Sequence, residues 1–219
     1  MSFFITSIEG EYALTTAGYV AVAVIIAALI FIAAAVSKKS EGKKMGTRQL
    51  VFCAMAIALA TVTSMVRIYR FPFGGSVTLC SMLFICLIGY MYGPATGILT
   101  GMAYGVLQFF VEPYILLPAQ VVLDYVLAFG ALGLSGFFWK SKNGLIKGYL
   151  LGIIGRYMFV VLSGCLFFGE YAWEGWAVLP YSLVYNGTYI FTEGVLTVII
   201  LLIPAVAKSI GQVKTMIVH

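Results

Sequence analysis

Charged residues are scarce in this chain, and their scarcity excludes an ordinary soluble domain. Charged side chains make up 10% of the 219 residues and hydrophobic ones 62%, with a mean hydropathy of +1.05. Soluble domains carry about 25% charged residues. The apolar runs are long and rich in Ala, Leu and Gly, which predicts spanning helices rather than the alternating strands of a membrane barrel. We therefore expect an all-α integral membrane protein.

Histidine and cysteine are too few or too scattered for several kinds of chemistry. The single histidine, His219, is the last residue, which argues against a histidine metal site or a catalytic triad. The four cysteines form no CxxC pair and lie in apolar segments, which favours packing over metal or redox roles. No P-loop is present, so we expect no ATP hydrolysis by this chain itself. We expect no enzymatic activity, no metal and no cofactor.

Seven apolar runs predict membrane spans. They cover about residues 17–36, 50–66, 78–90, 95–111, 117–138, 148–168 and 181–205. The strongest basic cluster, residues 38–48, follows the first run, and basic residues mark cytoplasmic loops. We therefore place the N-terminus outside and the C-terminus in the cytoplasm. Because the basic residues lie between apolar runs, where they set membrane topology, we expect no nucleic-acid partner. Residues 1–47 would form an extra N-terminal membrane helix with a basic linker, and residues 48–219 a six-helix membrane domain.

One carboxylate, Asp124, lies inside an apolar run. It falls about seven residues into the span 117–138, roughly 10 Å below the outer surface at about 1.5 Å per residue. A charge in the membrane is costly unless a partner satisfies it, so Asp124 indicates a cavity or the bundle interior. Gln120 and Tyr125 of the same span lie near Asp124. Residues of other spans lie at similar depth, namely Tyr104, Gln108, Gly164, Phe167, Phe168, Tyr181 and Asn186. This combination predicts a small-molecule pocket whose carboxylate favours a cation or hydrogen-bond donors.

A purely structural role for Asp124 is the alternative. It would then pair with Arg156 or with a tyrosine hydroxyl and order the bundle. Residue counting puts Arg156 near the inner end of its span, at a different depth from Asp124. Glu193 is therefore the expected partner of Arg156. Glu193 ends a polar stripe that also contains Ser182, Asn186 and Tyr189 at helical spacing.

Small residues recur at four-residue spacing and predict close helix packing. GxxxG patterns fill residues 97–105. The second span carries two AxxxA pairs on adjacent stripes, Ala54 with Ala58 and Ala56 with Ala60. Either stripe could pack inside the bundle or form a docking face for another membrane protein, and periodicity alone favours packing.

Five sequence blocks resemble a known family in the same order along the chain. They are FPFGGSVTLCSMLFICLIGYMYGP (71–94), YGVLQ (104–108), LDYVLAFGALGLSG (123–136), GRYMFVVLSGCLFFGEYA (155–172) and YSLVYNG (181–187). Over about residues 48–207 the chain resembles the thiamine-specific substrate-binding subunits, or S-components, of energy-coupling factor (ECF) transporters. Such subunits are six-helix proteins of the bacterial cell membrane that bind a vitamin from outside. The resemblance implies thiamine or a related small molecule as ligand, membrane lipid as surroundings, and a transmembrane coupling subunit with two ATPase subunits as partners.

The resemblance also implies roles for particular residues. In the family, an acidic residue followed by tyrosine contacts the ligand where Asp124 and Tyr125 stand. The implied substrate-binding set is Asp124, Tyr125, Tyr104, Tyr114, Gly164, Phe168, Tyr181 and Asn186. The family's docking face for the coupling subunit matches Ala54 and Ala58, which reverses the preference for packing at that stripe. Residues 67–75 would act as a lid.

The chain departs from many members of that family in its pocket. Asp124 replaces a glutamate, and residues that are tryptophan or histidine in some members are here Tyr104, Phe168 and Val160. A thiamine precursor or another vitamin is therefore an alternative ligand. A different class of protein, a self-sufficient proton-coupled secondary transporter with Asp124, Arg156 and Glu193 as proton relay, is a further alternative.

Overall fold

A computed structural model describes residues 5–8, 11–14, 16, 20 and 45–218 of the chain. Its main helices are α2 (Thr47–Met65), α3 (Ser81–Tyr92), α4 (Pro94–Val111), α7 (Gly144–Phe167), α8 (Val178–Leu201) and α9 (Pro204–Val218). One more helical segment consists of four consecutive pieces, α5 (Pro118–Val121), the π-helix η1 (Val122–Leu127), α6 (Ala128–Ala131) and the 3-10 helix η2 (Leu132–Phe138). The short elements are β1 (Ile5–Ile8), β2 (Glu11–Leu14), β3 (Arg67–Arg70), β4 (Ser76–Thr78) and the 3-10 turn η3 (Gly169–Tyr171).

Five helical segments are long and apolar enough to cross a membrane. They are Thr47–Met65, Pro94–Val111, Pro118–Phe138, Gly144–Phe167 and Val178–Leu201. The prediction of a helical membrane protein is confirmed by these segments. Apart from residue 20, the expected first span, 17–36, lies outside the described residues, as does most of the basic linker, so the division at residue 47 stays a prediction.

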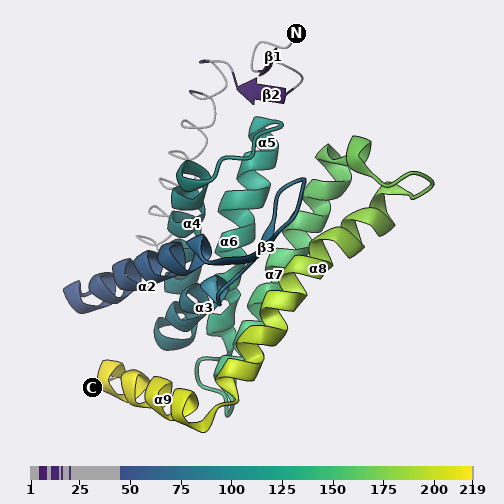
Figure 1. Cartoon of the computed structure of the whole chain (residues 1–219). Helices are drawn as coiled ribbons and strands as arrows, with labels where there is room; N and C mark the ends of the chain where they lie inside the picture. The colour runs from purple at the N-terminus through teal and green to yellow at the C-terminus, as the bar shows by residue number, and fades with distance from the viewer. Residues whose placement is uncertain (1–4, 9–10, 15, 17–19, 21–44, 219) are drawn as a thin grey trace.

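The long helices form a bundle with two differently oriented helices at its side and base. Figure 1 shows α4, the α5–η2 segment, α7 and α8 standing side by side, with α2 crossing at a steep angle and α9 turning back below. The core lies where α3, η2 and α7 meet, and its fully buried side chains include Ile85, Leu132 and Tyr149. In lipid such contacts stabilise a bundle through close packing rather than through exclusion of water.

Helix α4 packs against the α5–η2 segment almost backbone to backbone. A Cβ atom added at Gly101 would lie 2.3 Å from the carbonyl oxygen of Phe129, and one at Gly105 would lie 2.0 Å from that of Tyr125. On the opposite side, a Cβ at Gly133 would lie 2.0 Å from the backbone nitrogen of Ile98. The close packing predicted from the GxxxG patterns is therefore confirmed, and we call this contact the glycine seam.

The expected outer loop at residues 67–76 is wrong in one respect, because it contains regular structure. Strands β3 and β4 pair antiparallel and form a hairpin over residues 67–78. The turn contains Gly74 at φ +87° and Gly75 at φ +81°, a backbone conformation that glycine adopts without strain. The breakers that predicted an irregular loop therefore mark the turn of this β3–β4 hairpin.

Two span boundaries also differ from the prediction. Because the hairpin includes Thr78, the third helix begins at Ser81 and has 12 residues. It is about 18 Å long, shorter than a hydrocarbon core of about 30 Å. The span expected at 181–205 corresponds to α8, which ends at Leu201. Pro204 is then the first residue of α9.

Candidate ligand-binding site

A cavity of about 700 Å³ lies between α4, the α5–η1 segment, α7, α8 and the β3–β4 hairpin. This volume falls within the range of about 300–1,000 Å³ that is common for small-molecule sites. All eight residues predicted to bind a ligand line it: Tyr104, Tyr114, Asp124, Tyr125, Gly164, Phe168, Tyr181 and Asn186. Their shared location agrees with the predicted pocket, while their contact with a ligand stays a prediction.

Asp124 lies in a widened helical turn. The chain is π-helical over Val122–Leu127, and such turns are frequent at functional sites. The Gln120 side chain donates a hydrogen bond of 2.6 Å to Asp124 Oδ2 and accepts one of 3.1 Å from the Leu116 backbone N–H. Among residues 45–218 no further hydrogen bond to Asp124 is formed, and the buried Ser163 hydroxyl near it has no hydrogen-bond partner. Gln120 therefore orients the carboxylate and leaves one of its oxygens available to a ligand.

Tyr125 holds the segment that joins α4 to α5. Its hydroxyl donates to the Glu112 carbonyl oxygen and accepts from the Tyr114 backbone N–H, each at 2.8 Å. The Tyr114 ring then lies nearly parallel to that of Phe168, with centroids 5.8 Å apart and planes 18° apart. Burial raises the pKa of the Tyr114 phenol, which therefore stays neutral. Tyr125 thus positions an aromatic wall of the cavity.

The β3–β4 hairpin covers the cavity and is attached to two helices. The Tyr185 hydroxyl of α8 accepts from the Phe73 backbone N–H and donates to the Gly74 carbonyl oxygen, both at 2.9 Å. At the other side, Glu112 pairs with Arg67 at 2.7 Å and with Arg70 at 3.0 Å. Sequence reasoning missed Tyr185, although it lies one helical turn after Tyr181 on the same face. The hairpin has the position expected of a lid.

The comparisons with known proteins agree with this geometry. A model of the thiamine transporter protein family (Thia_YuaJ) matches residues 50–211. The chain belongs to this family. The thiamine transporter ThiT of Bacillus subtilis (strain 168) is 34% identical over 165 residues, which cover 69% of this chain and 84% of ThiT. The ThiT of Lacticaseibacillus paracasei is 30% identical over 125 residues, which cover 51% of this chain and 58% of that protein.

A solved structure shares the fold of this thiamine transporter family member. The structure of ThiT from Listeria monocytogenes superposes with a TM-score of 0.60 at 27% sequence identity. The match covers 70% of this chain and 92% of that chain. The resemblance inferred from the five sequence blocks is therefore confirmed, and the protein is a multi-pass membrane protein of a transporter family.

The cavity wall formed by α7 and α8 depends on their close approach at Gly164. A Cβ atom at Gly164 would lie 2.1 Å from Ser182 Oγ. Next to it, Asn186 Nδ2 donates to the Ser182 carbonyl oxygen at 3.0 Å, and Asn186 Oδ1 accepts from the Tyr189 hydroxyl at 2.8 Å. Both ends of the Asn186 amide are thus bonded within the protein. The Nδ2 group is used within the protein, whereas Oδ1 keeps a second lone pair that can accept a hydrogen bond from a ligand.

Tyr104 is a buried part of the cavity wall in this family member. Its side chain is fully buried and meets the Phe129 ring edge-on, with centroids 4.9 Å apart. Its hydroxyl donates to the Ala60 carbonyl oxygen at 3.3 Å and is hydrogen-bonded to Gln108. Tyr104 therefore supports the wall, whereas the Tyr114 and Phe168 rings are partly accessible.

Arg156 does not have the partner predicted for it. It lines the same cavity as Asp124. The expected ion pair with Glu193 is wrong: among residues 45–218 the ion pairs are those of Glu112 with Arg67 and Arg70. The Arg156 guanidinium instead lies 4.0 Å from the centroid of the Phe129 ring, a cation–π contact. The cavity extends far enough inward along α7 to include this cation.

Proposed function

We propose that this chain is the substrate-binding membrane subunit of an ECF-type importer that takes up thiamine from outside a bacterial cell. One observation carries the proposal: a member of the thiamine transporter family holds an oriented carboxylate in a hairpin-covered cavity of about 700 Å³. Thiamine is a cation with two flat rings, a thiazolium that carries the charge and an aminopyrimidine that donates hydrogen bonds. A carboxylate with a free oxygen and partly accessible aromatic rings is a suitable environment for such a molecule.

The residues of the cavity divide between recognition and support. We infer that Asp124 accepts a hydrogen bond from the aminopyrimidine and favours the thiazolium charge. Tyr114 and Phe168 provide ring faces, and Tyr181 with Asn186 closes the side formed by α8. Tyr125, Tyr104 and Gly164 act by shaping the wall, since their polar atoms or their close approach serve the protein.

The face of α2 that carries Ala54 and Ala58 supports a docking role. Both alanines are exposed, whereas Ala56 and Ala60 of the adjacent stripe are buried. The exposed face is otherwise apolar, with Val51, Met55, Leu59 and Val62. Small residues on such a face allow another helix to approach closely. We infer that the transmembrane coupling subunit docks here, that two ATPase subunits supply the energy, and that lipid covers the remaining apolar surface.

The proton-coupled alternative has less support. A relay through Asp124, Arg156 and Glu193 needs groups that can exchange protons in sequence. Glu193 accepts four hydrogen bonds from Thr78, Ser81 and Met82, two of them from backbone N–H groups. Uptake that continues without the ATPase partners and stops when the proton gradient collapses would favour this alternative over the importer subunit.

Thiamine binding by the purified protein tests the proposal directly. Trp173 lies 5.2 Å from Tyr181 between ring centroids, so intrinsic fluorescence reports on the cavity. We expect thiamine to quench this fluorescence, and Asp124→Asn to weaken binding by about 30- to 100-fold, because a charge-assisted hydrogen bond is lost. Glu174→Gln is the matched control, since Glu174 is exposed and does not line the cavity.

Each other outcome points to a specific revision. Binding of an aminopyrimidine precursor without binding of thiamine would assign the protein to the precursor. Thiamine binding that is unchanged in Asp124→Asn would show that recognition is centred on other residues. No binding of either compound would contradict the proposed ligand class.

A further inference from the structure

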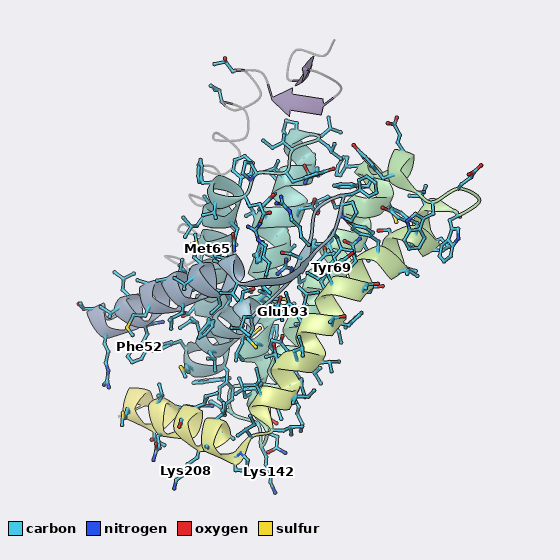
Figure 2. The ribbon with its side chains drawn as sticks, in the orientation of Figure 1. Phe52, Met65, Tyr69, Lys142, Glu193 and Lys208 are labelled. Atoms are coloured by element: carbon cyan, nitrogen blue, oxygen red, sulfur yellow. The ribbon has the colours of Figure 1, made fainter. Side chains whose placement is uncertain are left out.

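Glu193 is a buried carboxylate that ligand recognition does not use. It belongs to α8, its side chain is 3% exposed, and it lines the cavity. Figure 2 shows Glu193 on α8 beside the junction between the hairpin and α3. A buried carboxylate is costly unless hydrogen bonds or opposite charges stabilise it. The identity of its partners therefore indicates its role.

Within the described part of the chain, the hydrogen-bond donors to Glu193 come from the junction between β4 and α3. Oε2 accepts from the Thr78 backbone N–H at 3.1 Å and from the Thr78 hydroxyl at 2.6 Å. Oε1 accepts from the Ser81 hydroxyl and from the Met82 backbone N–H, each at 3.2 Å. One carboxylate thus binds the last residue of the hairpin and the first turn of the following helix.

The junction has no local substitute for this carboxylate. Cys80 precedes α3 in the left-handed conformation, at φ +59°, and provides no side-chain cap for the helix. A helix N-terminus leaves backbone N–H groups without partners and favours a negative charge. Glu193 supplies both the acceptor and the charge from a different helix. It therefore fixes the orientation in which the chain leaves β4 and enters α3.

We propose that Glu193 is a positioning residue that fixes the root of the β3–β4 hairpin to α8 and thereby controls how long the cavity retains its ligand. The inference rests on the proposed function for the identity of that ligand. The hairpin is held by α8 at two places, at its tip through Tyr185 and at its root through Glu193. Opening the cavity requires the hairpin to move relative to α8. Loosening the root makes that movement easier and speeds ligand escape.

The chemistry at the root requires a carboxylate rather than an amide. The Thr78 and Met82 backbone N–H groups can only donate, and they approach different oxygens of Glu193. A glutamine would place its NH₂ group against one of them. Glu193→Gln should therefore lose at least one buried hydrogen bond while it keeps the size and shape of the side chain.

Ligand dissociation measures the effect. Purified wild type and variants are loaded with labelled thiamine, and its release into excess unlabelled thiamine is followed. We expect Glu193→Gln to release thiamine at least about tenfold faster, the effect expected for one lost charge-assisted hydrogen bond. Thr78→Val, which removes one donor and keeps the carboxylate, should act in the same direction. The double variant should be less than additive because both changes break the same contact.

Ser135→Ala is the matched control. The Ser135 hydroxyl is buried and donates to the Cys86 carbonyl oxygen of α3 at 2.8 Å, but it does not line the cavity. Its loss weakens the packing of α3 without touching the hairpin, so thiamine release should stay near the wild-type rate. Equal acceleration in Ser135→Ala and Glu193→Gln would overturn the proposal in favour of general loosening. A release rate of Glu193→Gln within about twofold of wild type would overturn it as well.

A second measurement separates this inference from the proposed function. Amide hydrogen exchange of residues 70–78 is compared in wild type and variants without any ligand. Faster exchange in the hairpin of Glu193→Gln, with unchanged exchange in α4, supports the positioning role even if wild type binds no thiamine. Unchanged exchange in the hairpin contradicts the role. If Glu193→Gln does not fold, Thr78→Val and Ser81→Ala decide the question by the same two measurements.

Discussion

Removing the Tyr185 hydroxyl should open the hairpin at its tip. The hydroxyl makes two hydrogen bonds of 2.9 Å to backbone groups of the turn, one to Phe73 and one to Gly74. Each neutral hydrogen bond contributes about 1 kcal/mol net, so Tyr185→Phe should cost the closed arrangement about 2 kcal/mol. A difference of that size changes the ratio of open to closed hairpin by about 30-fold.

Thiamine release from the purified protein is the assay for this change. The phenylalanine ring keeps the edge-on contact with Phe71, whose centroid lies 5.6 Å from that of Tyr185, so only the hydroxyl bonds are lost. Tyr157→Phe is the control, because the Tyr157 hydroxyl donates to the Leu183 carbonyl oxygen at 3.0 Å and lies outside the cavity lining. We expect faster release from Tyr185→Phe alone. Equal release rates for Tyr185→Phe and wild type would refute the reasoning that these bonds hold the lid.

Two further predictions concern the ion pairs of the hairpin and the docking face of α2. Glu112→Gln removes both ion pairs of the hairpin, but Glu112 is 34% exposed, so we expect at most about fivefold faster thiamine release, an effect that high salt should abolish. A large effect that persists at high salt would contradict this. Ala58→Leu should abolish thiamine uptake by cells and leave binding by the purified protein intact, while Ala103→Leu on the exposed face of α4 leaves both intact. Loss of binding in Ala58→Leu would refute the docking assignment.

The pocket could be predicted from the sequence because its central feature is a chemical exception. Asp124 is a carboxylate in an apolar run, and polar or aromatic residues on neighbouring runs lie at a similar depth. The structure brings the predicted residues to one cavity. The close packing of α4 could be predicted for a similar reason, since glycines at four-residue spacing leave a smooth face along a helix.

Hydrogen-bond and ion-pair partners could not be predicted from residue spacing alone. Glu193 was expected to pair with Arg156, but its donors include backbone N–H groups of Thr78 and Met82, which no side-chain pattern reveals. The sequence predicts a loop here because glycines such as Gly74 and Gly75 are typical of irregular loops and of hairpin turns alike. The two strands are also too short to show an alternation of polar and apolar residues.

The π-helical turn at Val122–Leu127 separates two tasks of one helix. Asp124, within the turn, lines the cavity, while Tyr125 and the later residues Phe129 and Gly133 contact α4 in the glycine seam. One residue added or removed between Asp124 and Tyr125 rotates the part that carries Asp124 against the rest of the helix by about 100° and leaves the seam in register. Relatives that differ by a single residue here would present a different side chain to the ligand on an unchanged scaffold. An alignment without a gap would pair residues that face opposite surroundings, so ligand specificity cannot be transferred between relatives by residue identity alone at this turn.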